Sequence, residues 1–395
     1  MLTLPRTGKT HDQAARDLFP MIADSAADIE RTGRLPLSLL DVLHEARLFH
    51  MLSPRSVGGE EIDPVIFFNA IEALASADAS TAWCVGQGCG VAMASAYLDP
   101  AVAREIFGGP RSVVASGPNT RGARAVKTAG GYRVTARWMY ASGSRHSQWL
   151  AGHTSVFEEN GEPTRTPEGR RLDRTMLFEK CKATIFDDWQ VMGLRGTGSD
   201  SYEVADLFVP EEHTFTRDDP SDRRAHTPLQ SNFTGFNIFG LSFSALSLGV
   251  ARGMMGEFVT LASNKSPQSA QGAWLLRDNA VVQSKVAIAE ARLMAARGMV
   301  VDVYGRLWDQ ALQGRPFTLR DKADMRLAST FAMNEGREVV AVLYNASGGT
   351  AIFQKNSFER RFRDINCASQ QGQASQVNFE TIGQVLLGLE PKGRV

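Results

Sequence analysis

Apolar residues in the first 110 positions recur at helical spacing. In the segment that Thr10 can cap, they return every three or four residues as far as Ile29, with Pro20 as a candidate kink. Pro36, Pro64 and Pro100 mark three later helix starts, because the first turn of a helix does not use the N–H that proline lacks. The sequence predicts short helices that end at Gly108-Gly109-Pro110.

The helical period returns in the last part of the chain. It extends over residues 236–264, 273–312, 319–346 and 377–387. Three of these segments exceed the usual length of a globular helix, so they need partner helices to bury their apolar stripes. These residues are therefore expected to form a bundle.

Between residues 112 and 210 the apolar period changes to two, which is typical of strands. The candidate strands are 113–117, 132–140, 149–157, 175–180, 182–189 and 202–209, with a polar hairpin loop at 160–171. The fold class is α+β: an N-terminal helical domain (1–111), a small central β-barrel or sandwich (112–212), and a C-terminal four-helix bundle (213–395). The charged segment 211–230 precedes the bundle as a lid-like linker.

The loop from Asp187 to Pro210 carries the most informative chemistry. Its glycines are expected to let backbone N–H groups approach a ligand, its hydroxyls add donors, and its indole offers a flat apolar face. The residues are Trp189, Gly193, Gly196, Thr197, Gly198 and Ser199. A loop of this composition is usually a simple turn. Its meaning depends on a second stretch, 138–143 (WMYASG), at the end of another predicted strand.

Composition excludes several classes of protein. Lys plus Arg equals Asp plus Glu at 43 each, which gives no basic field for nucleic acid or anionic lipid. The four cysteines have no paired spacing, the seven histidines show no metal motif, and no serine-hydrolase elbow occurs. Gly86 to Gly90 (GQGCG) follows no strand and is interpreted as a site of close helix packing. The apolar run 236–250 is too short and polar to cross a bilayer and is expected to be a buried bundle helix.

WMYASG and the later WQVMGLRGTGS resemble the acyl-CoA dehydrogenase superfamily. More narrowly, they resemble its reduced-flavin-dependent monooxygenases, the oxygenase components of two-component hydroxylases. Further matches are Gly58-Gly59, 71–83 (IEALASADASTAW), Gly348-Gly349 and 360–364 (RRFRD), so the resemblance covers nearly the whole chain.

The resemblance implies roles for particular residues. Ser142 corresponds to the hydroxyl beside the reactive edge of the flavin, although a strand-end serine can simply bond its own backbone. Tyr140 and Trp189 would form the walls around the flavin ring. The alternative is that Trp138, Tyr140 and Trp189 are core residues of the β-domain, and for Trp138 the two roles are equally favoured. Thr197 and Ser199 would bond the flavin's polar edge or ribityl chain. Arg195, Arg277, Gly348, Gly349 and Arg363 would bind or support the cofactor, some across a subunit interface. Arg363-Asp364 is interpreted as a buried structural pair.

Departures from the family pattern are equally informative. Acyl-CoA dehydrogenases commonly place a glutamate base near position 372, yet no acidic residue occurs between Asp364 and Glu380. Aromatic hydroxylases tend to have a histidine near Gln371 and another near Cys89, and this chain has neither. Glutamine cannot accept a proton at neutral pH, so either the substrate needs no base or the base lies elsewhere. Gln371 is nevertheless predicted to face the catalytic pocket.

The predicted function is a flavin-dependent monooxygenase. A separate reductase would supply reduced FMN or FAD, delivery by diffusion alone being left open. The flavin would react with O₂ to a C4a-hydroperoxide, and the protein would exclude water while oxygen passes to a small, aromatic or heterocyclic substrate at carbon, nitrogen or sulfur. Phe67, Phe68, Phe233, Phe236, Phe239 and Met254 are candidates for the pocket or for ordinary core.

Two other classes stay open: an FAD-dependent acyl-CoA dehydrogenase, and a non-catalytic ligand-binding protein on the same scaffold. A dehydrogenase would purify yellow and bleach with an acyl-CoA. An oxygenase would purify nearly colourless and bind reduced flavin better than oxidised flavin. A non-catalytic protein would neither bleach with an acyl-CoA nor prefer reduced flavin. The expected protein binds no metal and is a homotetramer, or at least a dimer, because 273–346 has more apolar positions than one four-helix core needs. The N-terminal MLTLPRTGKTHDQ lacks an export pattern, so a cytoplasmic location is expected.

Overall fold

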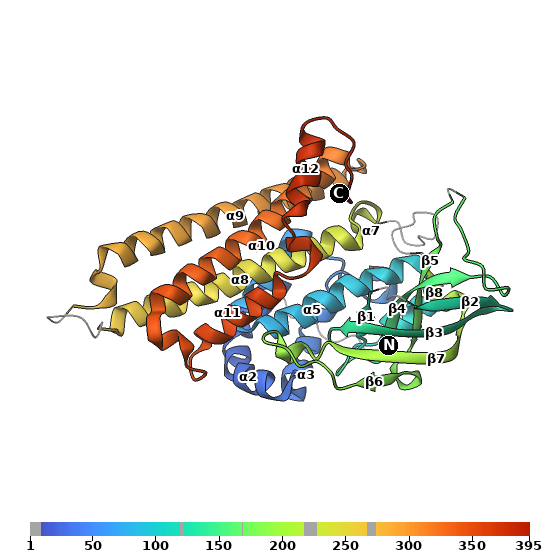
Figure 1. The fold of residues 1–395 in the computed structure, drawn as a ribbon, viewed down its shortest axis with the longest axis horizontal. Coiled ribbons are helices and arrows are strands. Elements are labelled where there is room, and N and C mark those ends of the chain that lie inside the picture. The colour runs from blue at the N-terminus through green and yellow to red at the C-terminus, as the bar shows by residue number, and fades with distance from the viewer. Residues whose placement is uncertain (1–8, 119–121, 168, 217–226, 267–273) are drawn as a thin grey trace.

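The computed structural model describes residues 9–118, 122–167, 169–216, 227–266 and 274–395. Helices form an elongated body, and a curved sheet lies at one end of it (Figure 1). Helix α5 (Ala79–Ala92) lies between the long helices and the sheet and contacts both.

The N-terminal part is helical, as predicted. Asp63, Asp78 and Asp99 cap their helices by accepting a backbone N–H in the first turn, and proline follows two of them. The predicted first helix is interrupted at Leu18, with Pro20 in the first turn of the second piece. The elements are α1 (His11–Asp17), α2 (Phe19–Thr32), α3 (Leu37–Glu45), η1 (Leu48–His50), η2 (Arg55–Val57), α4 (Pro64–Ala77), α5 (Ala79–Ala92), η3 (Met93–Tyr97) and α6 (Pro100–Phe107).

The strands of the described residues form one mixed eight-stranded sheet in the order β6-β7-β3-β2-β4-β5-β8, with β1 also paired to β4. They are β1 (Val114–Gly117), β2 (Arg124–Thr128), β3 (Gly131–Ala141), β4 (Trp149–Phe157), β5 (Asp173–Glu179), β6 (Thr184–Phe186), β7 (Asp200–Pro210) and β8 (Thr214–Phe215). Strands β1 and β2 run parallel to β4 along the same edge, and the other pairs are antiparallel.

Of the predicted barrel or sandwich, the barrel is wrong, because the sheet of the described residues is open. Its edge strands β6 and β8 have only 3 and 2 residues and do not pair with each other. The sheet nevertheless curls around a core of its own. The centre of the Trp138 ring lies 5.0 Å from that of Tyr202 on β7 and 5.8 Å from that of Phe178 on β5. Trp138 is therefore sheet core and not a wall of the cofactor site. Strands β2 and β8 were not predicted.

The last part contains the long helices. They are α8 (Gly235–Asn264), α9 (Ala280–Leu312) and α10 (Leu319–Ser347), accompanied by α7 (Pro228–Asn232), η8 (Leu276–Asp278), η9 (Gly348–Ile352), α11 (Ser357–Ala368), η10 (Gly372–Ala374) and α12 (Val377–Leu386). The predicted helix start at 273 and most of the predicted lid, 217–226, lie outside the described residues. Residues 360–364 of α11 were recognised only as a sequence motif, and no helix was predicted there. The bounds of the three predicted domains stay predictions.

Helix α8 is the one helix of the described residues that is long and apolar enough to cross a membrane. Its apolar window is 83% buried inside the protein, which agrees with the predicted bundle helix. Helix α5 packs closely against its neighbours because of its glycines. A Cβ on Gly86 would meet Ser242 Oγ of α8 at 2.1 Å, and one on Gly90 would meet the Phe239 ring at 2.4 Å. The packing interpretation of GQGCG is confirmed.

Candidate functional site

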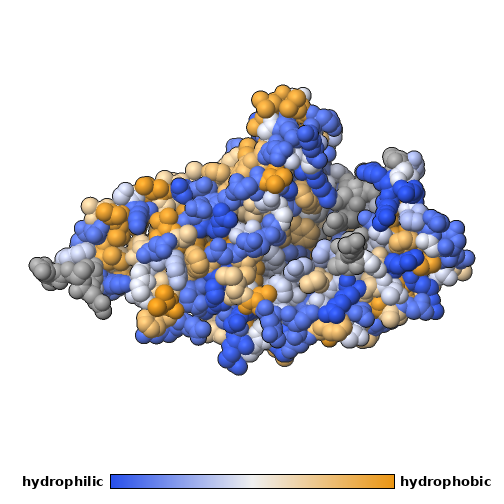
Figure 2. Space-filling model, viewed as in Figure 1, coloured by the Kyte–Doolittle hydropathy of each residue, from blue (hydrophilic) through white to orange (hydrophobic). Residues whose placement is uncertain are grey.

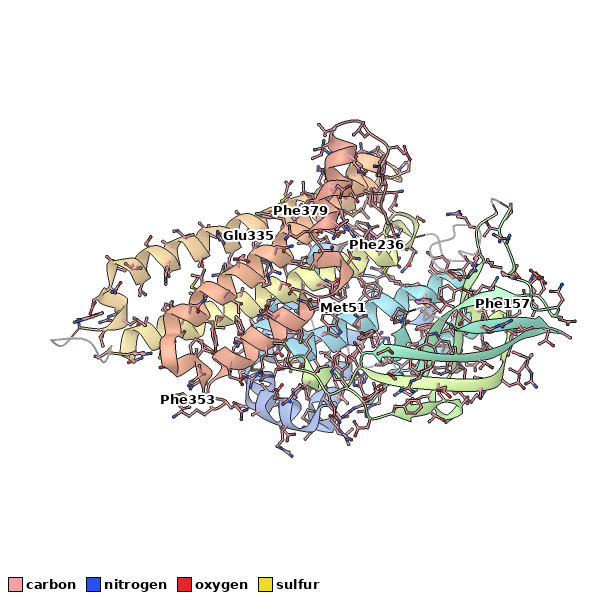
Figure 3. The ribbon with its side chains drawn as sticks, viewed as in Figure 1. Met51, Phe157, Phe236, Glu335, Phe353 and Phe379 are labelled. Carbon is pink, nitrogen blue, oxygen red and sulfur yellow. The ribbon has the colours of Figure 1, made fainter. Side chains whose placement is uncertain are left out.

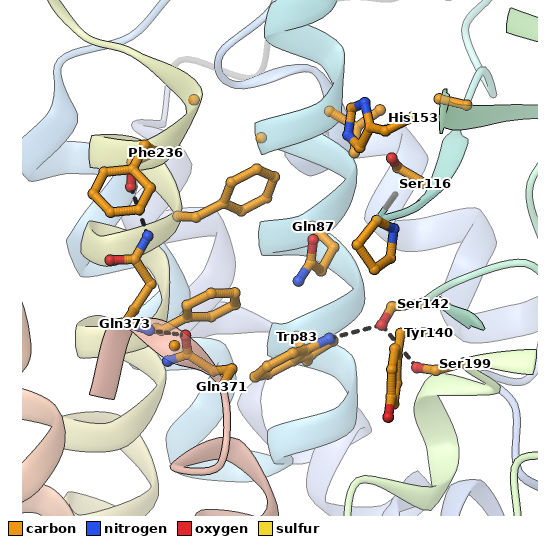
Figure 4. Close-up of a pocket in the computed structure, with 18 of the residues that line it drawn as sticks. Trp83, Gln87, Ser116, Tyr140, Ser142, His153, Ser199, Phe236, Gln371 and Gln373 are labelled. Carbon is orange, nitrogen blue, oxygen red and sulfur yellow. Dashed lines mark hydrogen bonds between the residues drawn. The ribbon is translucent and has the colours of Figure 1, made fainter. Parts of the chain in front are cut away.

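A cavity of about 850 Å³ lies where α5, the first turns of α8, η10 and the sheet meet. In Figure 4, Phe236, Gln373 and Gln371 lie on the helical side, Ser142, Tyr140 and Ser199 on the sheet side, and Trp83 of α5 between them. Of the predicted site residues, the cavity brings together six: Tyr140, Ser142, Trp189, Thr197, Ser199 and Gln371.

A chain of hydrogen bonds connects the hydroxyls on the sheet side. Ser142 Oγ lies 2.7 Å from Ser199 Oγ, which lies 2.7 Å from Thr197 Oγ1. At one end Trp83 Nε1 donates to Ser142 Oγ at 2.9 Å, and at the other Thr197 Oγ1 donates to the Leu194 carbonyl at 2.8 Å. The sequence motif contained Trp83, but nothing local indicated this contact.

The two ends of the chain fix its direction. A carbonyl only accepts, so Thr197 uses its single proton on Leu194 and must accept from Ser199. Ser199 must then accept from Ser142, and Ser142 accepts from Trp83. In this arrangement each hydroxyl proton is used inside the chain, so Ser142 presents a lone pair to the cavity and no donor.

Two aromatic residues lie beside the hydroxyls. Tyr140 is 57% exposed and adopts a left-handed backbone conformation (φ 62°), which turns it out of the sheet core. Its ring meets Trp189 edge to face at 6.2 Å, and Trp189 Nε1 donates to the Leu194 carbonyl at 3.0 Å. An exposed ring against a fixed indole offers an apolar wall to a flat ligand.

The loop glycines serve packing, not the ligand approach that the sequence suggested. A Cβ on Gly193 would meet the Arg363 backbone at 2.5 Å, and one on Gly196 would meet Ile29 at 2.0 Å. Gly198 has a left-handed φ of 47°, and a Cβ there would contact the Arg145 side chain at 2.6 Å. These glycines let the loop press against α2 and α11.

The predicted pair between Arg363 and Asp364 does not form. Adjacent residues on α11 point in different directions: Arg363 pairs with Glu359 at 2.6 Å and Glu30 at 2.7 Å, whereas Asp364 accepts the Leu194 N–H at 2.6 Å. Burial raises the pKa of the Asp364 carboxyl to about 7, and the negative charge of Asp78 acts in the same direction. Asp364 therefore anchors the residue whose carbonyl ends the hydroxyl chain.

The other predicted cofactor residues do not line the cavity. Arg195 is exposed near Glu30, and Arg363 takes part in the ion pairs just described. Arg277, Gly348 and Gly349 are exposed. They belong to η8 and η9, which adjoin the start of α9 and the end of α10, and these helix ends lie away from the sheet (Figure 1). Figure 3 labels Phe236 beside the cavity and Phe353, which closely follows Gly349, at that far end. Their roles in cofactor binding stay predictions, since a single chain does not contain a subunit interface.

On the helical side, the Gln371 side chain is fixed at both ends. Its amide nitrogen lies 3.1 Å from Met333 Sδ, and its oxygen accepts the Gln373 N–H at 2.6 Å. Of the apolar candidates, Phe236 and Phe239 line the cavity. Phe67, Phe68, Phe233 and Met254 belong to the core of the helical body.

The sequence did not identify four other cavity residues: Trp83, His153, Arg326 and Gln373. His153 Nδ1 lies 2.7 Å from Thr175 Oγ1 on the wall formed by β4 and β5. The sequence did contain one indication of this residue, because His153 is a titratable side chain within a predicted strand of mainly apolar and small residues. The described residues that line the cavity include no aspartate or glutamate, so none supplies the carboxylate base of a dehydrogenase. A search of the described residues finds no cluster of potential metal ligands.

The site is thus a mainly apolar cavity between a helical bundle and a sheet. One of its walls contains a chain of hydroxyl groups whose hydrogen bonds all run in the same direction. Comparison with known proteins agrees with this class. Residues 241–375 match the family described as Acyl-CoA dehydrogenase, C-terminal domain. The structure of XiaF from Streptomyces sp., in complex with FADH2 and glycerol, superposes with a TM-score of 0.88 at 23% identity, covering 97% of this chain and 96% of that one.

Curated relatives match almost the full chain. The oxygenase subunit HsaA of a flavin-dependent monooxygenase from Mycobacterium tuberculosis is 30% identical over 369 residues, 89% of each chain. Indole-3-acetate monooxygenase from Pseudomonas putida is 28% identical over 389 residues, 96% of this chain and 95% of the relative. The chain belongs to the oxygenase components of two-component flavin-dependent monooxygenases, built on the acyl-CoA dehydrogenase fold. It is an oxidoreductase of that class.

Proposed function

We propose that this protein uses O₂ and reduced FMN or FAD, supplied by a separate reductase, to transfer one oxygen atom to a small aromatic or heterocyclic molecule. The relatives named for indole-3-acetate and for resorcinol support an aromatic substrate. The observation that carries the proposal is the hydroxyl chain that ends at Ser142, on the wall of a mainly apolar cavity whose described lining residues include no carboxylate.

The residues of the sheet side fit a reduced flavin. Ser142 offers a lone pair, which matches the N5–H that reduced flavin carries and oxidised flavin lacks. Reversing the chain, so that Ser142 donates instead, would break the bond from Thr197 to the Leu194 carbonyl. Tyr140 and Trp189 supply the apolar wall for the ring. This polarity favours the reduced cofactor that a two-component oxygenase receives.

A bound reduced flavin would supply the two electrons that reduce O₂, so that one oxygen atom would enter the substrate and the other would leave as water. The protein's residues would orient the cofactor and the substrate and exclude water from the cavity. Trp83, stacked 4.6 Å from Phe243, closes the space between the hydroxyls and the helical side, and Phe236 and Phe239 continue that apolar lining. Excluding water favours oxygen transfer over release of H₂O₂.

On this proposal Ser142 and Gln371 face the reacting atoms from opposite sides of the cavity (Figure 4). Arg277, Gly348 and Gly349 would contact the distal part of a cofactor bound to a neighbouring subunit. Helix α9 exposes Val281, Ile288 and Met294 at 63%, 56% and 64%, and burial of these side chains would favour the homotetramer.

A stopped-flow experiment tests the proposal. Protein is mixed anaerobically with reduced FMN or FAD and then with O₂. We expect an absorbance spectrum distinct from both the reduced and oxidised flavin, lasting longer than with flavin alone. Immediate appearance of oxidised flavin, at the rate seen without protein, would contradict an oxygenase. Bleaching of tightly bound yellow FAD by an acyl-CoA would support the dehydrogenase instead.

A further inference from the structure

The helical side of the cavity contains a guanidinium without a carboxylate partner. Arg326 of α10 lines the cavity, and none of the described acidic side chains lies within ion-pair distance of it. Its Nε is buried and has no hydrogen-bond partner. A half-buried positive charge in a cavity wall normally has a counter-ion, and none of the described acidic side chains supplies one here.

Neutral amides hold the Arg326 side chain in place. Nη1 donates to Gln373 Oε1, and Nη2 donates to Asn378 Oδ1 at 2.6 Å. These amides are anchored in turn: Gln373 Nε2 donates to the Phe236 carbonyl at 3.1 Å, and Asn378 Nδ2 donates to the Gln373 carbonyl at 2.9 Å. The guanidinium carbon lies 4.2 Å from the centre of the Phe236 ring. The site fixes the orientation of the guanidinium without neutralising its charge.

Other arginines in comparable surroundings are neutralised. Arg361, which is buried, pairs with Glu257 at 3.0 Å, and Arg145 pairs with Asp200 at 2.7 Å. Burial lowers the pKa of Arg326 to about 10, and the positive charge of Arg394 adds to this effect. Arg326 is still a cation at neutral pH. Its lack of a carboxylate is therefore a property of this site and not a general feature of the fold.

We propose that Arg326 binds the carboxylate of the substrate, so that the substrate class is small aromatic acids. The inference rests on the proposed function, since it takes this cavity as the substrate site. Two of the five guanidinium N–H groups bind amide oxygens and the Nε–H is buried, which leaves one N–H on each terminal nitrogen as a coplanar pair of donors for a planar carboxylate. Phe236, Phe239 and Phe243 line the same side of the cavity and suit an aromatic body. The carboxylate would thus hold the ring between Arg326 and the sheet-side hydroxyls.

Acid and amide pairs test this proposal. The probes are indole-3-acetate with indole-3-acetamide, and phenylacetate with phenylacetamide. Calorimetric titration of anaerobic protein, with and without reduced FMN, gives the dissociation constants. We expect at least one acid to bind roughly 10- to 100-fold more tightly than its amide, the usual difference for a hydrogen-bonded charge. Arg326→Met should remove this preference.

The matched control is Arg320→Met on the same helix, because Arg320 is an exposed residue paired with Asp324 at 2.8 Å. It should keep the full acid preference. Arg326→Lys retains the charge without the planar donors, so we expect an intermediate preference, and this variant replaces Arg326→Met if the latter does not fold. Equal binding of acid and amide by the unmodified protein in both pairs, or an unchanged preference in the Arg326 variants, would overturn the proposal.

The outcome separates this proposal from the proposed function. Acid preference that depends on Arg326, without any oxygen transfer, would keep the carboxylate site and contradict the oxygenase. Oxygen transfer to the neutral amides, with no preference for acids, would keep the oxygenase and contradict the carboxylate site.

Discussion

Asp364→Asn is expected to remove a pH dependence from the stability of this protein. The carboxyl of Asp364 is buried, and its pKa is raised from 3.8 to about 7 in the folded chain, chiefly by burial. Between these two values the folded protein holds a proton that the unfolded chain has lost. The free energy of unfolding therefore falls as pH rises through this window and levels off above about pH 7.

The size of the effect follows from the shift. One proton changes the free energy of unfolding by at most about 1.4 kcal/mol per pH unit, so Asp364 alone would cost the protein about 3 kcal/mol between pH 5 and pH 8. Asparagine has a neutral side chain of similar shape, and its oxygen can still accept the Leu194 N–H that Asp364 accepts at 2.6 Å. The variant should gain this amount relative to the parent as pH rises from 5 to 8.

Urea denaturation at pH 5, 6, 7 and 8, followed by tryptophan fluorescence, measures the difference between parent and variant. All other titrating groups are common to both proteins and cancel in that difference. Asp206→Asn is the control, because Asp206 is an exposed carboxylate paired with Arg133 at 3.2 Å, and its removal should have no comparable trend. A difference between Asp364→Asn and the parent that stays constant across this range would refute the reasoning.

Four further outcomes are expected. Ser142→Ala should fold and lower product per reduced flavin, with more H₂O₂ and a rate loss of about 10-fold from the loss of one accepted hydrogen bond, and unchanged coupling would remove Ser142 from the mechanism. Thr197→Val deletes the proton donated to the Leu194 carbonyl, so the preference for reduced over oxidised flavin, measured by titration, should fall about 5-fold; an unchanged preference would contradict the polarised chain. Gln371→His adds a group with a pKa near ~6.5, so turnover or its pH profile should change, and overlaying profiles would count against this position. Sedimentation at micromolar concentration should give a tetramer or dimer, and Ile288→Glu on the exposed face of α9 should weaken it; a monodisperse parent monomer would contradict this prediction.

The exposed apolar side chains are not confined to α9. In Figure 2 an apolar group lies at the tip of α12, where Leu386, Leu387 and Leu389 are 47%, 78% and 57% exposed. Such clusters at the edge of a helical bundle are typical of subunit contacts. Their position makes α12 a second place to test by substitution if the α9 variant leaves the assembly intact.

The sequence by itself determined whether most of the long segments are helix or strand. Period-two strands in 132–140 and 149–157 and the long helical period of 236–264 correspond to β3, β4 and α8, because local periodicity reports which face of an element is buried. Aspartate followed by proline located the starts of α4 and α6 for an equally local reason. The two motifs that resembled the family also supplied the sheet side of the cavity.

Only the tertiary structure decided the contacts between distant segments. The sheet is open because its edge strands, β6 and β8, do not pair with each other. Pairing between strands depends on where the other strands lie in space, and a local sequence pattern does not contain that information. Asp364 reaches Leu194 across 170 positions, and Trp83 reaches Ser142 across 59. Arg326 looks in the sequence like any surface arginine of a helix. Its burial among amides, with no carboxylate to pair with, exists only once α10, η10 and α8 have packed around it.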